Sequence, residues 1–241
     1  MEKLTGHVRA AIDKYNMIAE NDRIAVGVSG GKDSMYLLYA LSSIRSYYPR
    51  KFELCAVTID PCFDGKEGDY SAVSELCEKL GIAYTIKRSN LAEVIFGGGL
   101  EGSPCSMCAR MRRGMLHNFC VEEGYNKIAL GHHLDDAVQT FLMNLFYGGK
   151  IGCFSPVTWL SRKKLTLIRP LLFCEENAVR RNAARLQLPI VKSLCPVDGI
   201  TARKDTELLI KNLEKQFPDL KSKVIGAMQR GDVDGWRAIE N

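Results

Sequence analysis

The segment Ser29-Gly-Gly-Lys-Asp-Ser34 combines residue types that bind phosphate. It follows the apolar run Ala25-Val-Gly-Val28 and precedes a predicted helix. Gly30 and Gly31 adopt backbone angles that other residues disfavour, so consecutive N–H groups can point into one concavity. The N-terminal end of the helix adds positive potential at the same place. The spacing is not that of a Walker A loop, so Lys32 is not placed as in kinases or GTPases. An ordinary glycine-rich turn is the alternative.

A second cluster, Gly131-His-His-Leu-Asp-Asp136, ends a predicted strand and opens a helix through Asp135. Carboxylates beside a phosphate site suit Mg²⁺, which bridges phosphate oxygens and neutralises their charge. We expect Asp136 to assist the metal and Asp33 to orient the metal or the phosphate, while Gly131 permits close backbone approach. Alternatively, Asp135 is only a helix N-cap and the two histidines are loop residues.

A third motif, Pro104-Cys-Ser-Met-Cys108, is followed by Ala109-Arg-Met-Arg-Arg-Gly114. Two cysteines three residues apart at the start of a helix project to one side, and the helix terminus favours their thiolate forms. Cys105 and Cys108 could hold a metal, react as a redox pair or carry a persulfide. A pair of unreactive buried thiols is the remaining alternative.

An alternation of strands and helices must position these motifs. The predicted strands cover residues 23–28, 53–60, 83–87 and 127–130. The predicted helices cover residues 4–19, 33–46, 69–80, 106–123, 135–146, 204–216 and 219–229, with a glycine-rich loop at 97–102. This order predicts an α/β fold, a doubly wound and mostly parallel sheet with helices on both faces. All three motifs would then lie beyond the carboxyl ends of the strands, where such sheets bind ligands.

Composition is typical of a soluble enzyme. The chain has 241 residues, 46% of them hydrophobic and 25% charged, with a net charge of +5. It has no apolar run near the roughly 20 residues of a membrane span and does not begin with a secretory signal, so we expect a cytoplasmic protein without a membrane partner. An odd count of nine cysteines indicates reduced thiols or metal ligands instead of disulfides.

Together, SGGKDS, PCSMCxRxRRG and KIALGHHLDDAVQTFLMNLFYGGK resemble the TtcA family of tRNA 2-thiocytidine synthetases, iron–sulfur-dependent members of the PP-loop ATPase superfamily, whose fold is called adenine nucleotide alpha-hydrolase-like. The resemblance covers residues 20–195. It implies a PP-loop ATPase domain at 1–195, with an N-terminal helix and an inserted CxxC, and a helical C-terminal extension at 196–241. It also implies that ATP adenylates a carbonyl oxygen, with pyrophosphate leaving from the Ser29–Ser34 loop.

The same resemblance implies a [4Fe-4S] cluster held by three cysteines. Two are Cys105 and Cys108, and the matching third position is Cys195 in Lys192-Ser-Leu-Cys-Pro196. Three ligands leave one iron open to carry a sulfide to the activated carbon. The implied partners are tRNA and a sulfur donor, such as a cysteine desulfurase or free sulfide, and a homodimer is compatible with the resemblance.

We expect backbone groups near Val57 to Ile59 to contact and recognise the adenine. The residues expected to bind ATP and Mg²⁺ are Ser29, Gly30, Gly31, Lys32, Asp33, Ser34, Val57, Ile59, Gly131 and Asp136. The residues expected to carry the chemistry are Asp33, Cys105, Cys108 and Cys195. AMP would leave when sulfide replaces the oxygen, most plausibly at C2 of a tRNA cytidine.

Several alternatives stay open at this level. Tetrahedral zinc on the cysteines would need a fourth ligand, such as Cys174 or a histidine. The chain could be a cluster-free ligase or amidating enzyme, or a nucleotide-binding or iron–sulfur sensor without turnover. Residues 196–203 depart from the family pattern and the C-terminal region is short, so the acceptor could be something other than tRNA.

The remaining cysteines and the basic clusters carry weaker signals. Cys55, Cys77 and Cys120 fall in predicted strands or helices and are expected to be apolar packing residues. The sequence leaves the role of Cys62, Cys153 and Cys174 open. Three basic clusters could contact phosphates or be solvated surfaces. They are Arg110, Arg112 and Arg113; Arg162, Lys163 and Lys164; and Arg180, Arg181 and Arg185.

Overall fold

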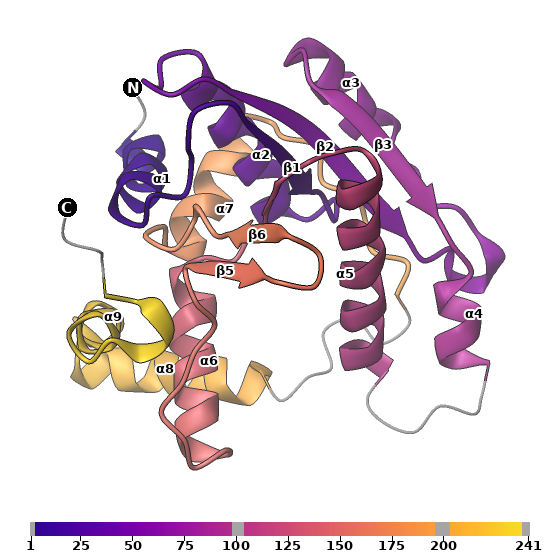
Figure 1. Ribbon diagram of the computed structural model, residues 1–241. Helices are drawn as coiled ribbons and strands as arrows, with labels where there is room; N and C mark the ends of the chain where they lie inside the picture. Colours follow the sequence, from indigo (N-terminus) through magenta and orange to yellow (C-terminus); the bar gives the residue numbers. More distant parts are fainter. Residues whose placement is uncertain (1–2, 98–103, 196–202, 238–241) are drawn as a thin grey trace.

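A six-stranded sheet forms the centre of the molecule in the computed structural model, which describes residues 3–97, 104–195 and 203–237 (Figure 1). The strand order is β3-β2-β1-β4-β6-β5, and only β5 runs antiparallel to its neighbour. The strands are β1 (Asp22–Gly27), β2 (Phe52–Asp60), β3 (Ala83–Arg88), β4 (Lys127–Ala129), β5 (Val157–Leu160) and β6 (Leu165–Ile168). The predicted doubly wound, mostly parallel sheet is confirmed.

Alternate side chains of the central strands enter two separate cores, as the period of two in a strand requires. In β1, Ile24 and Val26 join the larger core, whereas Ala25 joins the smaller one. Helices of both faces cover these cores (Figure 1). The larger core contains side chains of α1 (Lys3–Lys14), α2 (Lys32–Arg45), α3 (Ser71–Lys79), α6 (Leu134–Phe146) and α7 (Glu176–Arg185), and the smaller one contains side chains of α4 (Leu91–Phe96) and α5 (Pro104–Glu122).

The C-terminal helices share the larger core. Helices α8 (Arg203–Gln216) and α9 (Leu220–Arg230) pack against α6 and contribute Ile210 and Met228 to that core. Beyond the short turn η2 (Val233–Gly235), Trp236 is fully buried, and its indole N–H donates to Phe154 O at 2.9 Å. The segment after residue 195 is therefore packed onto the α/β unit and has no core of its own among the described residues.

The predicted elements agree with the structure within a few residues, with one clear error. We expected the first helix to continue to residue 19, but α1 ends at Lys14, because Asn16 has a left-handed φ of 46° that a helix does not accommodate. The sequence reading lacked α4, α7, the β5–β6 hairpin and the short turn η1 (Phe63–Gly65). Most of the predicted loop at 97–102 lies outside the described residues. In the part of the chain described, no helix has the length and apolar character to cross a membrane.

Candidate active site

The Ser29–Ser34 loop forms a closed turn between β1 and α2. The Ser34 hydroxyl accepts from Ser29 N–H (3.1 Å) and donates to Gly31 O (2.9 Å). Gly30 has a φ of +84°, and a Cβ there would lie 2.7 Å from the Cβ of Val191. Gly31 is the N-cap of α2 and has no side chain to bond the first N–H groups of the helix. Those groups remain available to an anion, as the sequence predicted.

Lys32 is held between two carboxylates beside this loop. Its Nζ lies 3.0 Å from Asp33 Oδ2 and 3.0 Å from Glu176 Oε1, at the start of α7. Burial lowers the pKa of Lys32, but the two carboxylates outweigh burial and raise this pKa above its usual value. Burial raises the pKa of Glu176, but Lys32 and Arg180 outweigh it and lower this pKa to about 2. The lysine is therefore charged, and Glu176, which the sequence reading missed, positions it.

Asp33 directs its second oxygen toward the loop after β4. Its Oδ1 is buried, has no hydrogen-bond partner among the described residues and lies 3.9 Å from His133 Nε2. A buried carboxylate oxygen without a partner is unfavourable unless a cation or donor binds it. This oxygen beside a phosphate cradle fits a divalent cation such as Mg²⁺, which needs only one or two carboxylates besides phosphate.

The second motif differs in detail from the prediction. His133, not Asp135, is the N-cap of α6: its Nδ1 accepts from Asp136 N–H (3.3 Å), and Asp136 Oδ2 accepts from His133 N–H (3.0 Å). One oxygen of Asp136 is thus already used. Asp135 instead accepts from Glu176 N–H (2.7 Å) and pairs with Lys221 of α9 (2.8 Å). The paired carboxylates therefore have separate structural partners, and Asp135 connects α6 to α7 and α9.

Gly131 brings the loop after β4 against the start of α2. A Cβ at this position would lie 3.1 Å from Ser34 N and 3.2 Å from the carbonyl carbon of Asp33. The predicted close backbone approach is present, and its partner is the phosphate loop itself. Any larger residue would push the two motifs apart.

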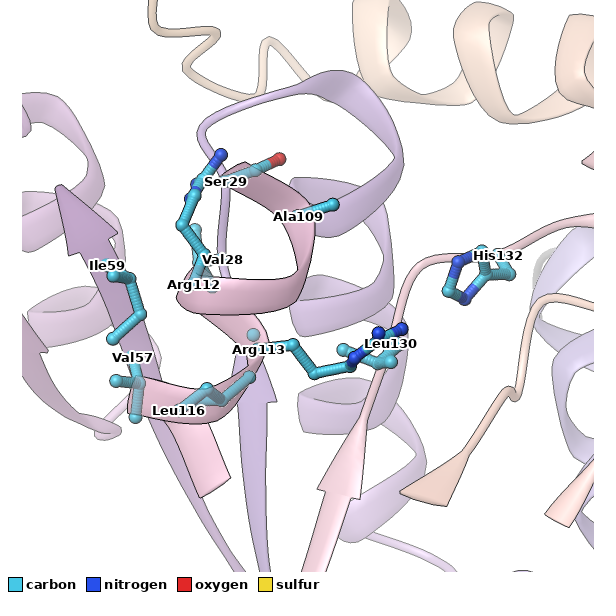
Figure 2. A pocket seen from close by; sticks show the side chains of 11 residues that line it. Val28, Ser29, Val57, Ile59, Ala109, Arg112, Arg113, Leu116, Leu130 and His132 are labelled. Atoms are coloured by element: carbon cyan, nitrogen blue, oxygen red, sulfur yellow. The ribbon is translucent and has the colours of Figure 1, made fainter. Parts of the chain in front are cut away.

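A cavity of about 250 Å³ opens at the carboxyl ends of β1, β2 and β4 (Figure 2). Its lining is largely apolar and includes Val28, Ser29, Val57, Ile59, Ala109, Arg112, Arg113, Leu116, Leu130 and His132. In Figure 2, Val57 and Ile59 line one side, Leu130 lies on the other, and Arg113 extends toward Leu130. A cavity with apolar walls and Ser29 at its rim suits a purine next to its phosphates.

The backbone beside this cavity refines the predicted adenine contact. Val57 O accepts from Val28 N–H at 2.8 Å, so Val57 contributes its side chain to the cavity while its carbonyl is bonded. The pairing of β1 with β2 ends at Gly27 and Val57. Ile59, two residues further on, directs its backbone groups to the same side, past the end of β1. Ile59 is therefore the better placed of the two to read an adenine edge.

The cysteine motif opens α5, with Pro104 at its first position, Cys105 at its second and Cys108 at its fifth, one turn further on. Burial raises the pKa of the Cys108 thiol, and the thiols of Cys195 and Cys105 raise it further, while Arg112 partly offsets them. The three thiols are therefore electrostatic neighbours. The expectation that the helix terminus lowers the thiol pKa is wrong for Cys108, because burial and the other thiols dominate.

These three thiols are half-buried. Three thiols are the donor type of an iron–sulfur cluster, and their number leaves one iron without a protein ligand. Within residues 3–97, 104–195 and 203–237, no three His, Cys, Asp or Glu side chains are already arranged as a metal site. The three thiols supply the donor chemistry that such a cluster requires.

The segment that carries Cys195 is attached to the phosphate loop. Val191 N–H donates to Gly30 O at 3.0 Å. A second cavity, of about 480 Å³, lies between them and is lined by Ser29, Gly31, Asp60, Arg112 and residues 190–194, among others. Arg112 lines both cavities and is close enough to Cys108 to offset part of the rise in the pKa of its thiol.

The other cysteines have different surroundings. Cys55, Cys77 and Cys120 are buried, and burial raises the pKa of their thiols to about 11, 11 and 12, which confirms them as packing residues. Cys174 is fully buried in the larger core, whereas Cys108 packs against the smaller one, so Cys174 is not a fourth metal ligand. Cys62 lines a separate cavity of about 810 Å³.

The fold and its phosphate loop define a nucleotide-binding α/β protein, and a family model described as a PP-loop domain matches residues 4–192. A tRNA-cytidine(32) 2-sulfurtransferase of Syntrophotalea carbinolica is 40% identical over 95% of this chain and 87% of its own length. That of Geobacter metallireducens is 37% identical, with 94% and 88% covered. The chain belongs to the PP-loop family and, within it, to the tRNA-cytidine(32) 2-sulfurtransferases.

A solved structure agrees with this assignment. The U34-tRNA thiolase NcsA of Methanococcus maripaludis, determined with its [4Fe-4S] cluster, is 28% identical to this chain. The TM-score is 0.77, and the match covers 99% of this chain and 79% of that protein.

Proposed function

We propose that this protein uses ATP to activate C2 of a cytidine in tRNA and replaces the C2 oxygen with sulfur. The observation that carries the proposal is the attachment of the Cys195 segment to the phosphate loop, through Val191 N–H and Gly30 O at 3.0 Å. This bond joins the phosphate loop to the segment that carries Cys195, four residues further on, and so supports a cluster thiol close to the nucleotide. The choice of a tRNA cytidine as the substrate is supported by the names of the relatives.

In the activation step, the cytidine O2 attacks the α-phosphorus, the bond to the β-phosphate oxygen breaks, and pyrophosphate leaves. The N–H groups at the start of α2 hold the pyrophosphate. Lys32 leaves its ion pair with Glu176, pairs with a phosphate oxygen instead and so adds a positive charge. Asp33 would hold Mg²⁺ through the oxygen that has no hydrogen-bond partner among the described residues, and Asp136 would support the metal site. Adenine occupies the apolar cavity, with its edge at Ile59.

In the replacement step, sulfide bonds to C2, the C2–O bond breaks, and AMP leaves with the oxygen. A [4Fe-4S] cluster on Cys105, Cys108 and Cys195 would supply that sulfide at its open iron. Arg112, which lines both cavities, neutralises charge on the departing AMP. The apolar walls of the nucleotide cavity exclude water, which would otherwise hydrolyse the adenylate.

The test is a measurement of iron and acid-labile sulfide in anaerobically prepared protein, with products from ATP and a tRNA transcript analysed by mass spectrometry. We expect about four iron atoms per chain and 2-thiocytidine in the RNA. Cys195→Ala should lose the iron, whereas Cys62→Ala, a half-buried cysteine in a different cavity, should retain it. Iron content that is indifferent to Cys195 would refute the cysteine assignment. AMP formation by iron-free protein would indicate a cluster-free ligase.

A further inference from the structure

Two basic clusters that are far apart in the sequence form one surface. Arg110, Arg113 and His117 follow one another at spacings of three and four along α5, so they share a face of the helix. Lys163 Nζ donates to Asn118 Oδ1 at 2.8 Å, which attaches the turn of the β5–β6 hairpin to α5 (Figure 1). The α5–hairpin surface consists of Arg110, Arg113, His117, Arg162, Lys163 and Lys164.

Among the described residues, no carboxylate forms an ion pair that balances the positive charge of this surface. Burial lowers the pKa of His117, and Arg113 and Lys163 lower it further. Arg169 lies behind the surface, only 7% exposed, and burial together with Arg113 lowers its pKa to about 10. None of the arginine and lysine side chains of this surface, nor Arg169, is in an ion pair with a carboxylate of the described residues. Crowded cations without acids favour the binding of an anion.

Buried nitrogen atoms point to the same conclusion. Arg169 Nη1 donates to Ser155 O at 2.5 Å and to Thr158 Oγ1 at 3.1 Å. Its guanidinium lies 5.0 Å from the centroid of the Phe154 ring, but its Nε is buried without a hydrogen-bond partner among the described residues. His117 Nε2 is likewise buried and has no described partner. A buried cation without an acid is costly in the isolated protein, and an anion on the adjoining surface offsets that cost.

The surface also lies where a polymeric substrate has to pass. Arg113 lines the nucleotide cavity and extends across it toward Leu130 (Figure 2). The basic face of α5 begins at Arg110, two residues beyond Cys108, and continues to the hairpin turn. An RNA whose base reaches the α-phosphate of ATP bound in this cavity therefore has its backbone next to these cations.

We propose that the α5–hairpin surface binds the phosphodiester backbone of the RNA whose base reaches the ATP bound in the nucleotide cavity. This inference rests on the proposed function and names the part of the molecule that holds its substrate. The third basic cluster is not part of it, because α7 packs in the larger core, on the other face of the sheet, and Arg180 is bonded to Glu176 at 2.9 Å. Phosphate contacts on this surface position and orient the RNA.

The test compares two double variants of the holoprotein in binding to a tRNA transcript. Arg110→Gln with Lys163→Gln removes two exposed charges of the surface and leaves the cavity lining intact. Arg181→Gln with Lys79→Gln removes two exposed charges from helices of the other face and serves as the matched control. Fluorescence anisotropy gives the RNA affinity between 50 and 200 mM salt, about the range over which counterion release is visible.

We expect the surface variant to bind RNA about fivefold more weakly for each charge removed, hence about twenty-five-fold in all near 0.15 M salt. The slope of log K against log salt should fall by about one for each contact. The control variant should match the wild type in both respects, and ATP affinity should be equal in all three proteins.

Three results would overturn the inference. Equal RNA affinity and salt slope in the two double variants would exclude the surface as the RNA site. Weakened ATP binding in the surface variant would assign the charges to the phosphates of the nucleotide. Normal RNA binding with loss of affinity for an acidic protein partner would assign them to that partner. Wild-type protein that binds no tRNA would instead refute the proposed function itself.

Discussion

Substitution of Gly30 by alanine tests the contact between the phosphate loop and the Cys195 segment. With a φ of +84°, alanine loses about 1–2 kcal/mol from backbone strain. Its Cβ would lie 2.7 Å from Val191 Cβ, so the backbone must move, at a further cost of about 1–3 kcal/mol. The sum of about 2–5 kcal/mol corresponds to a fall in melting temperature of about 10 °C in a chain of this size.

The assay is thermal unfolding followed by far-UV circular dichroism, with Gly81→Ala as the control. Gly81 also has a positive φ, +61°, but nothing lies within 4 Å of its Cβ position. We therefore expect only the strain component, about 1–2 kcal/mol, in Gly81→Ala. The additional loss of stability in Gly30→Ala then measures the free-energy cost of the contact with Val191.

A second substitution makes the test more specific. The nearest atom to the new methyl group is the Cβ of Val191, so Val191→Gly should relieve the contact and Val191→Ala should not. A double-mutant cycle gives the interaction energy directly. Equal melting temperatures for Gly30→Ala and Gly81→Ala, or equal rescue by both Val191 variants, would refute the reasoning.

Three further predictions concern the site and the core. Asp33→Ala should abolish AMP and pyrophosphate formation with little change in melting temperature, because it removes the buried oxygen beside the phosphate loop; normal AMP production would contradict this role. Urea unfolding should show stability falling as pH drops from about 4.5 toward about 2, because the pKa of Glu176 is lowered in the folded protein and its pairing with Lys32 is complete only above the unfolded value. Glu176→Gln should reduce this pH dependence, and an unchanged profile would exclude the ion pair as its cause. Trp236→Ala should cost about 3–5 kcal/mol in the same assay, and a loss below about 1 kcal/mol would mean that the C-terminal segment is not part of the core.

The elements that were predicted correctly are those whose own residue pattern is enough to identify them. β2 is a nine-residue apolar strand and is recognisable by itself, and the glycines of the phosphate loop mark its position without tertiary information. The polar helix α7 buries only Val179 and Ala183, so its pattern gives little signal. The strands β5 and β6 have four residues each, too few for a clear period.

Within the candidate site, the sequence motifs identified residues that lie together in one loop. They missed residues whose place in the site depends on partners far away in the sequence. Glu176 meets Lys32 across 144 positions of the chain, and no local feature marks it as a partner. Val191 is an ordinary valine until its contact with Gly30 is seen. The thiol pKa of Cys108 was expected to fall, because helix geometry can be read from the sequence and burial cannot.

The hydrogen bond between Gly30 and Val191 means that the phosphate loop and the segment that carries Cys195 support each other. Removing the cysteine-bearing segment would leave a Gly30 carbonyl and the wall of a cavity without a neighbour, so the loop edge would have to be rebuilt. The converse also holds, because a redesigned loop with a side chain at position 30 would displace Val191 and, four residues on, Cys195. Transplanting the cysteines alone onto another nucleotide-binding protein would therefore not transfer sulfur chemistry, since the graft has to include the loop that supports them.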